Sequence, residues 1–278
     1  MKDLIQKRLE RYNAKNAEEE LMGLKEITQE VILYSLYNSG FFEKASFLGG
    51  TSLRILHGID RFSEDLDFST KTIQDGLEFD RYLEEAGRTM VAYGYDLSIN
   101  KKDLDDRAVQ SRFIKDDSIK KVLSFKYFQD PRQKIKIKIE IDTSPPLGAV
   151  HTFSYVDFPE DFPVSIHDLP TLLAGKLHAL LCRRYSKGRD WYDFLWYVSN
   201  KINPNLVFLK NALFQFGPWK GKRIEINSIF IKKELTRKIQ SLDWADLALD
   251  VRKFLTQDRA KSLDLWSIEF FESKLKKL

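Results

Sequence analysis

Two carboxylates, Asp65 and Asp67, have the residue type and spacing needed to hold a metal ion. They lie two residues apart in Asp65-Leu66-Asp67-Phe68, which is typical of a short strand, so both side chains should leave the same face. Two carboxylates held this close repel each other unless a cation neutralises them. Mg²⁺ prefers oxygen ligands of this kind, and Mn²⁺ accepts the same ligands. The spacing therefore predicts a site for Mg²⁺, with Mn²⁺ as the alternative ion.

A glycine pair, Gly49 and Gly50, lies between a short expected strand and an expected helix. Glycine lets the backbone approach a phosphate closely. The start of the helix directs free amides and a positive dipole end toward an anion. The hydroxyls of Thr51 and Ser52 would add donors. These residues predict that a nucleoside triphosphate (NTP) binds beside the carboxylates as substrate.

A third acid would complete a two-metal site, and Glu140 and Asp142 are the candidates. Both lie on the polar face of the run 134–142, in which four isoleucines alternate with lysines and acids. Two ions about 3.5–4 Å apart can activate an attacking hydroxyl and stabilise a leaving pyrophosphate. The residues alone leave open which of the two acids is the ligand.

Lys176 and Asp190 are the candidate polar residues of the second half of the chain. Lys176 lies beside the apolar stripe of an expected helix, so its amine could emerge toward a triphosphate. Asp190, at the start of the next helix, could orient Lys176 or Arg189 rather than touch a metal. A surface lysine and an acid favoured by the helix dipole are equally good interpretations of the pattern alone.

The periodicity of apolar residues predicts the elements that must position these side chains. Strands are expected at 46–48, 66–68, 95–99, 121–125 and 134–142. Helices are expected at 3–12, 18–38, 51–57, 78–92, 169–185, 189–200, 205–215, 232–241, 244–256 and 263–276. This order predicts an α+β fold, with a mixed sheet core, flanking helices and a C-terminal helical half. The expected domains cover residues 1–165 and 166–278.

The composition excludes several classes of protein. The chain has 278 residues, of which 43% are hydrophobic, so it can bury a sizeable core. A single cysteine rules out an internal disulfide, and the four histidines do not cluster with it, so no zinc site is expected. There is no signal-peptide pattern and no run of about 18 apolar residues, so we expect a cytoplasmic protein without a membrane partner.

The glycine pair and the two acids together resemble the signature of the polymerase-β-like nucleotidyltransferase superfamily, in Gly49-Gly50-Thr51 and Asp65-Leu66-Asp67-Phe68. More narrowly, the chain resembles the AbiEii/AbiGii toxin family. The blocks that match this family are Gly49-Gly50-Thr51-Ser52-Leu53, Arg61-Phe62-Ser63-Glu64-Asp65-Leu66-Asp67, and the stretches 172–180 and 188–193. Here Thr51 stands where the family often has serine, and the spacer before Asp65 is longer than usual.

The resemblance implies a polymerase-β-like fold and a Mg²⁺-dependent nucleotidyltransferase toxin of a bacterial toxin–antitoxin or abortive-infection (phage-defence) system. Related members transfer nucleotides from an NTP, often a pyrimidine, onto the 3′ acceptor end of tRNA, which blocks translation. The implied partners are the tRNA acceptor stem and a cognate antitoxin protein.

The resemblance and the residue chemistry together give a set of candidate site residues. The candidate catalytic residues are Asp65, Asp67, Lys176 and Asp190. The candidate nucleotide-binding residues are Gly49, Gly50, Thr51, Ser52, Arg61, Ser63 and Lys176. The candidate metal ligands are Asp65, Asp67, Glu140 and Asp142.

Two other functions remain open from the sequence. The same fold could transfer a nucleotide to a protein (AMPylation) or to a small molecule. Alternatively, the chain could be a non-catalytic partner-binding module that has kept the fold, although the intact acids and Lys176 argue against this.

Overall fold

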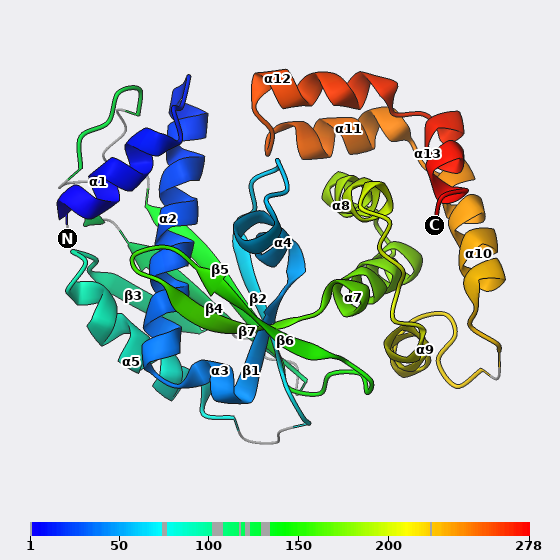
Figure 1. Cartoon of the computed structure of the whole chain (residues 1–278), viewed down its shortest axis with the longest axis horizontal. Helices are drawn as coiled ribbons and strands as arrows, with labels where there is room; N and C mark the ends of the chain where they lie inside the picture. The colour runs from blue at the N-terminus through cyan, green and yellow to red at the C-terminus, as the bar shows by residue number, and fades with distance from the viewer. Residues whose placement is uncertain are drawn as a thin grey trace. The chain divides into compact units, whose positions relative to one another are not determined.

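The structure is a computed structural model that describes residues 2–73, 77–101, 108–116, 118–119, 123–128, 134–222 and 224–278. The chain divides into two compact units (Figure 1). Unit 1 comprises Met1–Gly58, Phe62–Pro145 and His151–Ile166, and unit 2 comprises Ile59–Arg61, Pro146–Val150 and His167–Leu278. The division into domains at residues 1–165 and 166–278 stays a prediction.

Unit 1 is built on a seven-stranded sheet with the order β3-β4-β5-β2-β1-β7-β6. The strands are β1 (Ala45–Leu48), β2 (Asp65–Thr70), β3 (Leu97–Lys101), β4 (Val109–Asp116), β5 (Ile135–Asp142), β6 (His151–Val156) and β7 (Phe162–His167). β2 pairs with β5 in parallel and with β1 in antiparallel orientation, so the sheet is mixed. Because β2 is central, its side chains are flanked by strands on both sides.

The alternation in β5 decides which face of the sheet is the core. The four isoleucines of β5 are at most 1% exposed, whereas Lys138, Glu140 and Asp142 on the other face are partly exposed. In β2, Leu66 and Phe68 are likewise buried, and Asp65 and Asp67 between them are partly exposed. The two strands therefore share one apolar face and one polar face.

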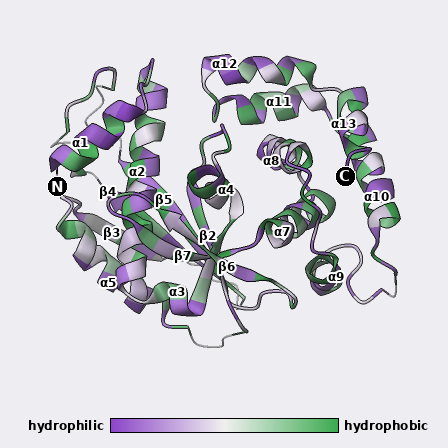
Figure 2. Ribbon diagram, viewed as in Figure 1, coloured by the Kyte–Doolittle hydropathy of each residue, from purple (hydrophilic) through white to green (hydrophobic). Residues whose placement is uncertain are grey.

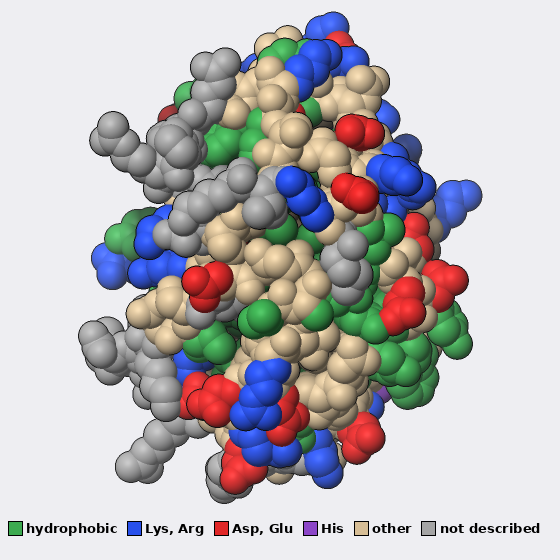
Figure 3. Space-filling model, turned by 90° about the vertical axis from the view of Figure 1, so that its left-hand side faces the viewer, with side chains coloured by type: hydrophobic (Ala, Val, Ile, Leu, Met, Phe, Trp, Pro, Cys, Tyr) green, Lys and Arg blue, Asp and Glu red, His purple; other side chains and the backbone are tan. Residues whose placement is uncertain are grey.

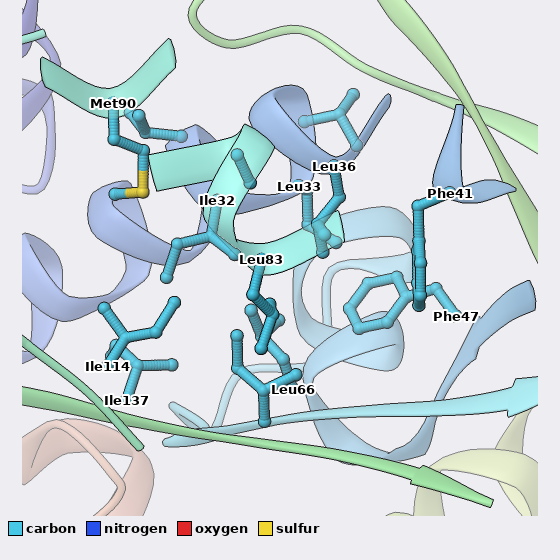
Figure 4. Packing of buried hydrophobic residues seen from close by; sticks show 14 of the residues in the cluster. Ile32, Leu33, Leu36, Phe41, Phe47, Leu66, Leu83, Met90, Ile114 and Ile137 are labelled. Carbon is cyan, nitrogen blue, oxygen red and sulfur yellow. The ribbon is translucent and has the colours of Figure 1, made fainter. Parts of the chain in front are cut away.

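Helices of unit 1 cover the apolar face of the sheet. They are α1 (Lys2–Arg11), α2 (Ala17–Asn38), α3 (Phe41–Lys44), α4 (Gly49–His57) and α5 (Phe79–Val91). Figure 4 shows Ile32 and Leu33 of α2 and Leu83 of α5 on one side of Leu66 and Ile137 of the sheet. Burial of these aliphatic side chains contributes about 1.5–3 kcal/mol each, so this core fixes β2 and β5 in place.

Unit 2 is mostly helical. Its helices are α7 (Leu169–Cys182), α8 (Gly188–Ser199), α9 (Leu206–Gln215), α10 (Ser228–Gln240), α11 (Trp244–Arg252), α12 (Gln257–Ala260), the 3₁₀ helix η1 (Lys261–Leu265) and α13 (Ile268–Leu275). Figure 2 shows hydrophobic and hydrophilic residues alternating along α10 and α11, and the buried residues of these helices are apolar, as expected for helices with one buried face. Trp191, Trp244 and Phe271 pack together, with ring centroids 3.8 Å apart for Trp244 and Phe271.

The α+β class and the mixed sheet are confirmed, and most predicted helices are present to within a few residues. The strand expected at 121–125 is wrong: Leu123, Ser124 and Phe125 are not in a strand, and residues 121 and 122 lie outside the described residues. The helices expected at 244–256 and 263–276 are shorter in the structure. α11 ends at Arg252, the short helices α12 and η1 follow, and α13 begins at Ile268. Three strands were missed: β4, β6 and β7.

Within the part of the chain that the structure describes, no helix combines the length and apolar character needed to cross a membrane.

Candidate active site

The Asp65 and Asp67 carboxylates lie on the polar face of β2. Both side chains are partly exposed, and Leu66 between them is fully buried on the opposite face. The parallel register with β5 sets Lys138 beside Asp65 and Glu140 beside Asp67. Partners in register lie on the same face of a sheet, so the polar face carries three acids and one lysine side by side.

The glycine turn packs directly against the second acid. Leu48, the last residue of β1, pairs with Asp67, and the next residue, Gly49, has a left-handed φ of 82°. A Cβ atom built on Gly49 would lie 2.3 Å from Asp67 Oδ2 and 3.0 Å from Asp67 Cβ. Glycine is therefore required twice over: for its φ and for the approach of the backbone to Asp67. The turn therefore lies directly against the second acid, whereas a shared functional site stays a prediction.

The helix that follows begins at Gly49, two residues earlier than expected. Its N-cap position is occupied by Leu48, whose side chain has no oxygen to accept a bond from the first amides. Such a helix start directs N–H groups and the positive end of the dipole outward, which is the arrangement that binds anions such as phosphate.

The two hydroxyls of this turn serve the backbone. Thr51 Oγ1 donates to the carbonyl oxygen of Asp65, and Ser52 Oγ donates to that of Gly49 at 2.9 Å. Both residues are fully buried. In this arrangement Thr51 ties the first turn of α4 to the start of the strand that carries the acids. Phosphate contacts from these hydroxyls stay a prediction.

The two candidates for a third acid differ in their register. Glu140 lies beside Asp67, whereas Asp142 lies beside Ser69, two residues further along β2. Glu140 accepts a hydrogen bond from Ser111 Oγ at 2.6 Å, and its other oxygen is 2.5 Å from Lys138 Nζ. Burial raises the pKa of Asp142.

The three acids of the polar face suit a divalent cation, because they offer carboxylate oxygens, the donors that Mg²⁺ prefers. Among the described residues, however, no three histidine, cysteine or acidic side chains converge as a ligand cluster. The side chain of Glu140 is turned to Lys138 and Ser111, so it would have to reorient to join Asp65 and Asp67 on an ion.

Unit 2 contains a second polar centre, built from α7, α8 and the short segment Ile59–Arg61. Lys176 Nζ lies 2.7 Å from Asp190 Oδ1 and 2.7 Å from Asp193 Oδ2. Arg61 donates two hydrogen bonds to Asp193, at 2.5 Å and 2.7 Å. Arg183 pairs with the second oxygen of Asp190. Three cations thus alternate with two carboxylates in one connected network.

The network is largely removed from solvent. The exposed fraction of the side chain is 0% for Asp193, 3% for Arg61, 7% for Asp190 and 13% for Lys176. Buried charges are stable only when paired and hydrogen-bonded, and here each buried member has a partner of opposite charge.

Opposing effects set the pKa values in this network. Burial by itself raises the pKa of the Asp190 carboxyl, but Lys176 and Arg183 outweigh burial and bring it to about 2. Burial by itself lowers the pKa of Lys176, but Asp190 and Asp193 outweigh it and raise this pKa. Asp190 and Lys176 therefore both carry full charge at neutral pH.

The structure brings some predicted residues into unexpected roles. Asp190 contacts Lys176, one of the two alternatives that the sequence left open. Asp193, three residues further along the same helix face, also contacts Lys176 and is not among the predicted site residues. Arg61, expected to bind nucleotide, uses its guanidinium on Asp193 and is 2% exposed. Ser63, also expected to bind nucleotide, accepts a hydrogen bond from Gln29 on its backbone oxygen at 3.1 Å.

Comparison with curated proteins finds no match for this chain. Among solved structures, JHP933 from Helicobacter pylori has 17% sequence identity and a TM-score of 0.51, covering 91% of this chain and 94% of that chain. A protein described as a candidate nucleotidyltransferase from H. pylori also has 17% identity, with a TM-score of 0.50, covering 95% of this chain and 98% of that chain. At this identity both similarities show the fold alone.

The sequence also matches a protein-family model, over a longer stretch than the motifs around the acids. The match covers residues 31–271, and so includes α4, β2, β5 and the helices that hold Lys176 and Asp190. The chain belongs to the family of the nucleotidyl transferase AbiEii toxin, a type IV toxin–antitoxin system.

Proposed function

We propose that the chain transfers a nucleotide from an NTP to the 3′ acceptor end of tRNA, in a Mg²⁺-dependent reaction that stops translation. The observation that carries the proposal is the packing of Gly49 against Asp67, because it joins a phosphate-binding turn to a pair of carboxylates. A nucleotidyltransferase needs these two parts together, since the acids would hold a metal ion that neutralises charge on the phosphates held by the turn.

In this proposal Asp65 and Asp67 hold the catalytic cation, and Glu140 is the third ligand. Glu140 is preferred over Asp142 because it lies in register with Asp67, whereas Asp142 is displaced by two residues, about 6.6 Å along the strand. When bound, a pair of ions would activate the acceptor hydroxyl and stabilise the leaving pyrophosphate.

The turn residues bind the triphosphate by their backbone. Gly49 and Gly50 bring amide groups close to the phosphates at the start of α4, where the helix dipole favours an anion. Thr51 and Ser52 contribute by holding this turn in shape through their bonds to Asp65 and Gly49. Electrostatic positioning of this kind is the main source of catalysis in phosphoryl-group chemistry.

Lys176 supplies positive charge to the phosphates, and Asp190 orients it. Within unit 2 the amine is held between two carboxylates, so its orientation in that unit is fixed. Preorganised charge costs no rearrangement during the reaction and therefore favours the transition state. Arg61 acts through Asp193, as a positioning residue for this same lysine.

The acceptor and the nucleotide can be identified in one experiment. The purified chain is incubated with each labelled NTP and Mg²⁺, together with total tRNA or with a protein extract free of RNA. Label is expected in tRNA, added at the 3′ end, as read by sequencing of 3′ ends. Label in protein alone would instead support AMPylation. Absence of label from both acceptors, with growth arrest retained by Asp67→Asn, would support a non-catalytic module.

Membership in a toxin–antitoxin family implies an antitoxin as a partner of the chain. Co-expression of the neighbouring gene product should relieve growth arrest caused by the wild-type chain. Growth arrest that persists at full strength would contradict this part of the proposal.

A further inference from the structure

The chain between α7 and α8 forms an exposed basic loop. Residues 183–189 read Arg-Arg-Tyr-Ser-Lys-Gly-Arg and contain four cations and no acid. We define residues 183–187 of this stretch as the basic loop. On the face drawn in Figure 3, by contrast, basic and acidic side chains are interspersed, which is the usual pattern of a solvated surface.

An aromatic ring lies in the middle of the basic loop. Tyr185 is 74% exposed, and the guanidinium carbon of Arg184 lies 5.3 Å from the centre of its ring. A tyrosine that packs into a core is buried, as Tyr197 of α8 is at 1% exposure. The exposed ring and the arginine beside it offer two flat surfaces on which an unpaired base can stack.

The two ends of the basic loop are fixed. The N–H of Arg183 donates to Ala179 O at the end of α7, and its carbonyl accepts a bond from Lys238 of α10 at 3.2 Å. At the other end, the N–H of Gly188 donates to Asp250 at 2.8 Å. A Cβ on Gly188 would lie 2.0 Å from the carbonyl oxygen of Leu247, so this residue is packed against α11. Contacts with α7, α10 and α11 therefore hold the loop at both of its ends.

One carboxylate joins the basic loop to Lys176. Asp190 Oδ1 accepts from Lys176 at 2.7 Å, and Asp190 Oδ2 accepts from Arg183. The arginine that begins the loop and the lysine proposed to meet the triphosphate are thus held by the two oxygens of a single side chain. A strand bound along the loop would lie next to Lys176.

We infer that the basic loop binds the single-stranded 3′ end of the RNA acceptor, with Tyr185 and Arg184 stacking on bases and Arg183 and Lys187 facing phosphates. The inference rests on the proposed function for the identity of the acceptor. RNA fits better than an acidic protein partner, because an exposed ring with a guanidinium beside it matches the π-face of a base, and protein acids have no such face.

Binding of RNA can be measured without catalysis. The probe is a short single-stranded RNA with a 5′ fluorophore, titrated with the full chain in the absence of NTP, and its anisotropy gives the Kd. The test variant is Tyr185→Ala with Arg184→Ala. The matched control is Tyr155→Ala with Arg237→Ala, which removes a tyrosine 73% exposed on β6 and an arginine 62% exposed on α10. Unchanged melting temperatures will show that all variants remain folded.

The loop variant should bind the RNA at least about tenfold more weakly than wild type, and the control should bind normally. Loss of Lys187, in Lys187→Ala, should lower the slope of log Kd against log salt by about 0.7. Equal affinity of the loop variant and wild type would overturn the inference, as would absence of RNA binding by wild type. Loss of antitoxin neutralisation with RNA affinity retained would also overturn it and mark the loop as a protein surface.

The result separates this inference from the proposed function. If wild type binds RNA through the loop but transfers no nucleotide to it, the proposed reaction fails and the loop remains an RNA-binding element. If transfer to tRNA occurs and the loop variant has the wild-type KM for tRNA, the proposed reaction is supported. The inference that the basic loop binds RNA is then rejected.

Discussion

Gly49 lies so close to Asp67 that a Cβ atom on the glycine would stand 2.3 Å from a carboxylate oxygen. The contact links the turn after β1 to the acidic strand β2, and it leaves no space for any other residue at position 49. The geometry of the proposed catalytic acids therefore depends on a residue that contributes no side chain.

Gly49→Ala should lower both stability and activity. The left-handed φ alone costs an alanine about 1–2 kcal/mol, and the new methyl group must also displace Asp67. The matched control is Gly87→Ala in α5, where a Cβ meets open space, so stability should rise by about 0.4–1 kcal/mol. Thermal melting and nucleotide transfer should be measured for both. Wild-type transfer by Gly49→Ala would contradict the required contact with Asp67.

Arg61→Met should destabilise the chain strongly, because it leaves Asp193 buried with one partner fewer. Loss of one member of a buried ion pair costs about 3–5 kcal/mol. Arg237→Met, which breaks an exposed pair with Glu234, should cost about 0–1 kcal/mol. Urea unfolding gives both values. A cost for Arg61→Met as small as that for Arg237→Met would show that the buried pair does not hold this part of unit 2.

Lys176→Met should reduce nucleotide transfer more than it reduces stability. Asp190 keeps Arg183 and Asp193 keeps Arg61 after the substitution, so each buried carboxylate still has a cationic partner and the chain should remain folded. Transfer should nevertheless fall by about 100-fold or more, since one preorganised charge is removed. Rates should be measured at saturating tRNA with NTP varied. Retention of the wild-type rate in a folded Lys176→Met chain would remove Lys176 from the proposed mechanism.

Acid should remove the contribution of Asp190 to stability. Its pKa in the folded chain is lowered to about 2, below the ordinary value of 3.8, so the unfolded chain binds the proton more readily. The stabilisation is fully present above pH 3.8 and is lost as the pH falls toward 2. It amounts to about 2 kcal/mol.

The test compares the free energy of unfolding of wild type and Asp190→Asn from pH 6 to pH 3. The difference between them should be constant near neutral pH and should shrink below about pH 4. Asp258→Asn, at a side chain that is 92% exposed, should match wild type at pH 6. A difference for Asp190→Asn that stays the same at pH 3 would contradict the lowered pKa.

Much of the sheet could be predicted because its alternation is simple. The isoleucines of β5 and the pair Leu66 and Phe68 of β2 have only apolar residues on the buried face, so a period of two is visible. In β4, by contrast, Arg112 and Asp116 are buried at 4% and 1% exposure. Arg112 is buried because it pairs with Asp80, a residue of another element. Pairing across the fold hides the alternation, and the strand was missed.

Pairing between residues far apart in the sequence also limited what could be predicted about the candidate site. The link between the glycine turn and the acids could be inferred from local motifs, since turn, helix and strand follow each other closely. The pairing of Arg61 with Asp193 joins residues 132 positions apart, and no local pattern selects one acid of α8 for one arginine. The spacing of Asp190 and Asp193, three residues apart on one helix, is the local signal that could have indicated that both acids point to the same centre.

The central claim is that Asp65 and Asp67 hold the cation required for transfer, and a Mg²⁺ titration of transfer tests it most directly. Incorporation of labelled nucleotide into tRNA is measured against Mg²⁺ concentration for wild type, Asp65→Asn, Asp67→Asn and the exposed control Asp258→Asn. Wild type and the control should depend on Mg²⁺ alike, and the two site variants should be slower by about 100-fold or more at every concentration. Transfer by a folded Asp67→Asn chain at the wild-type rate and with the wild-type Mg²⁺ dependence would contradict the account.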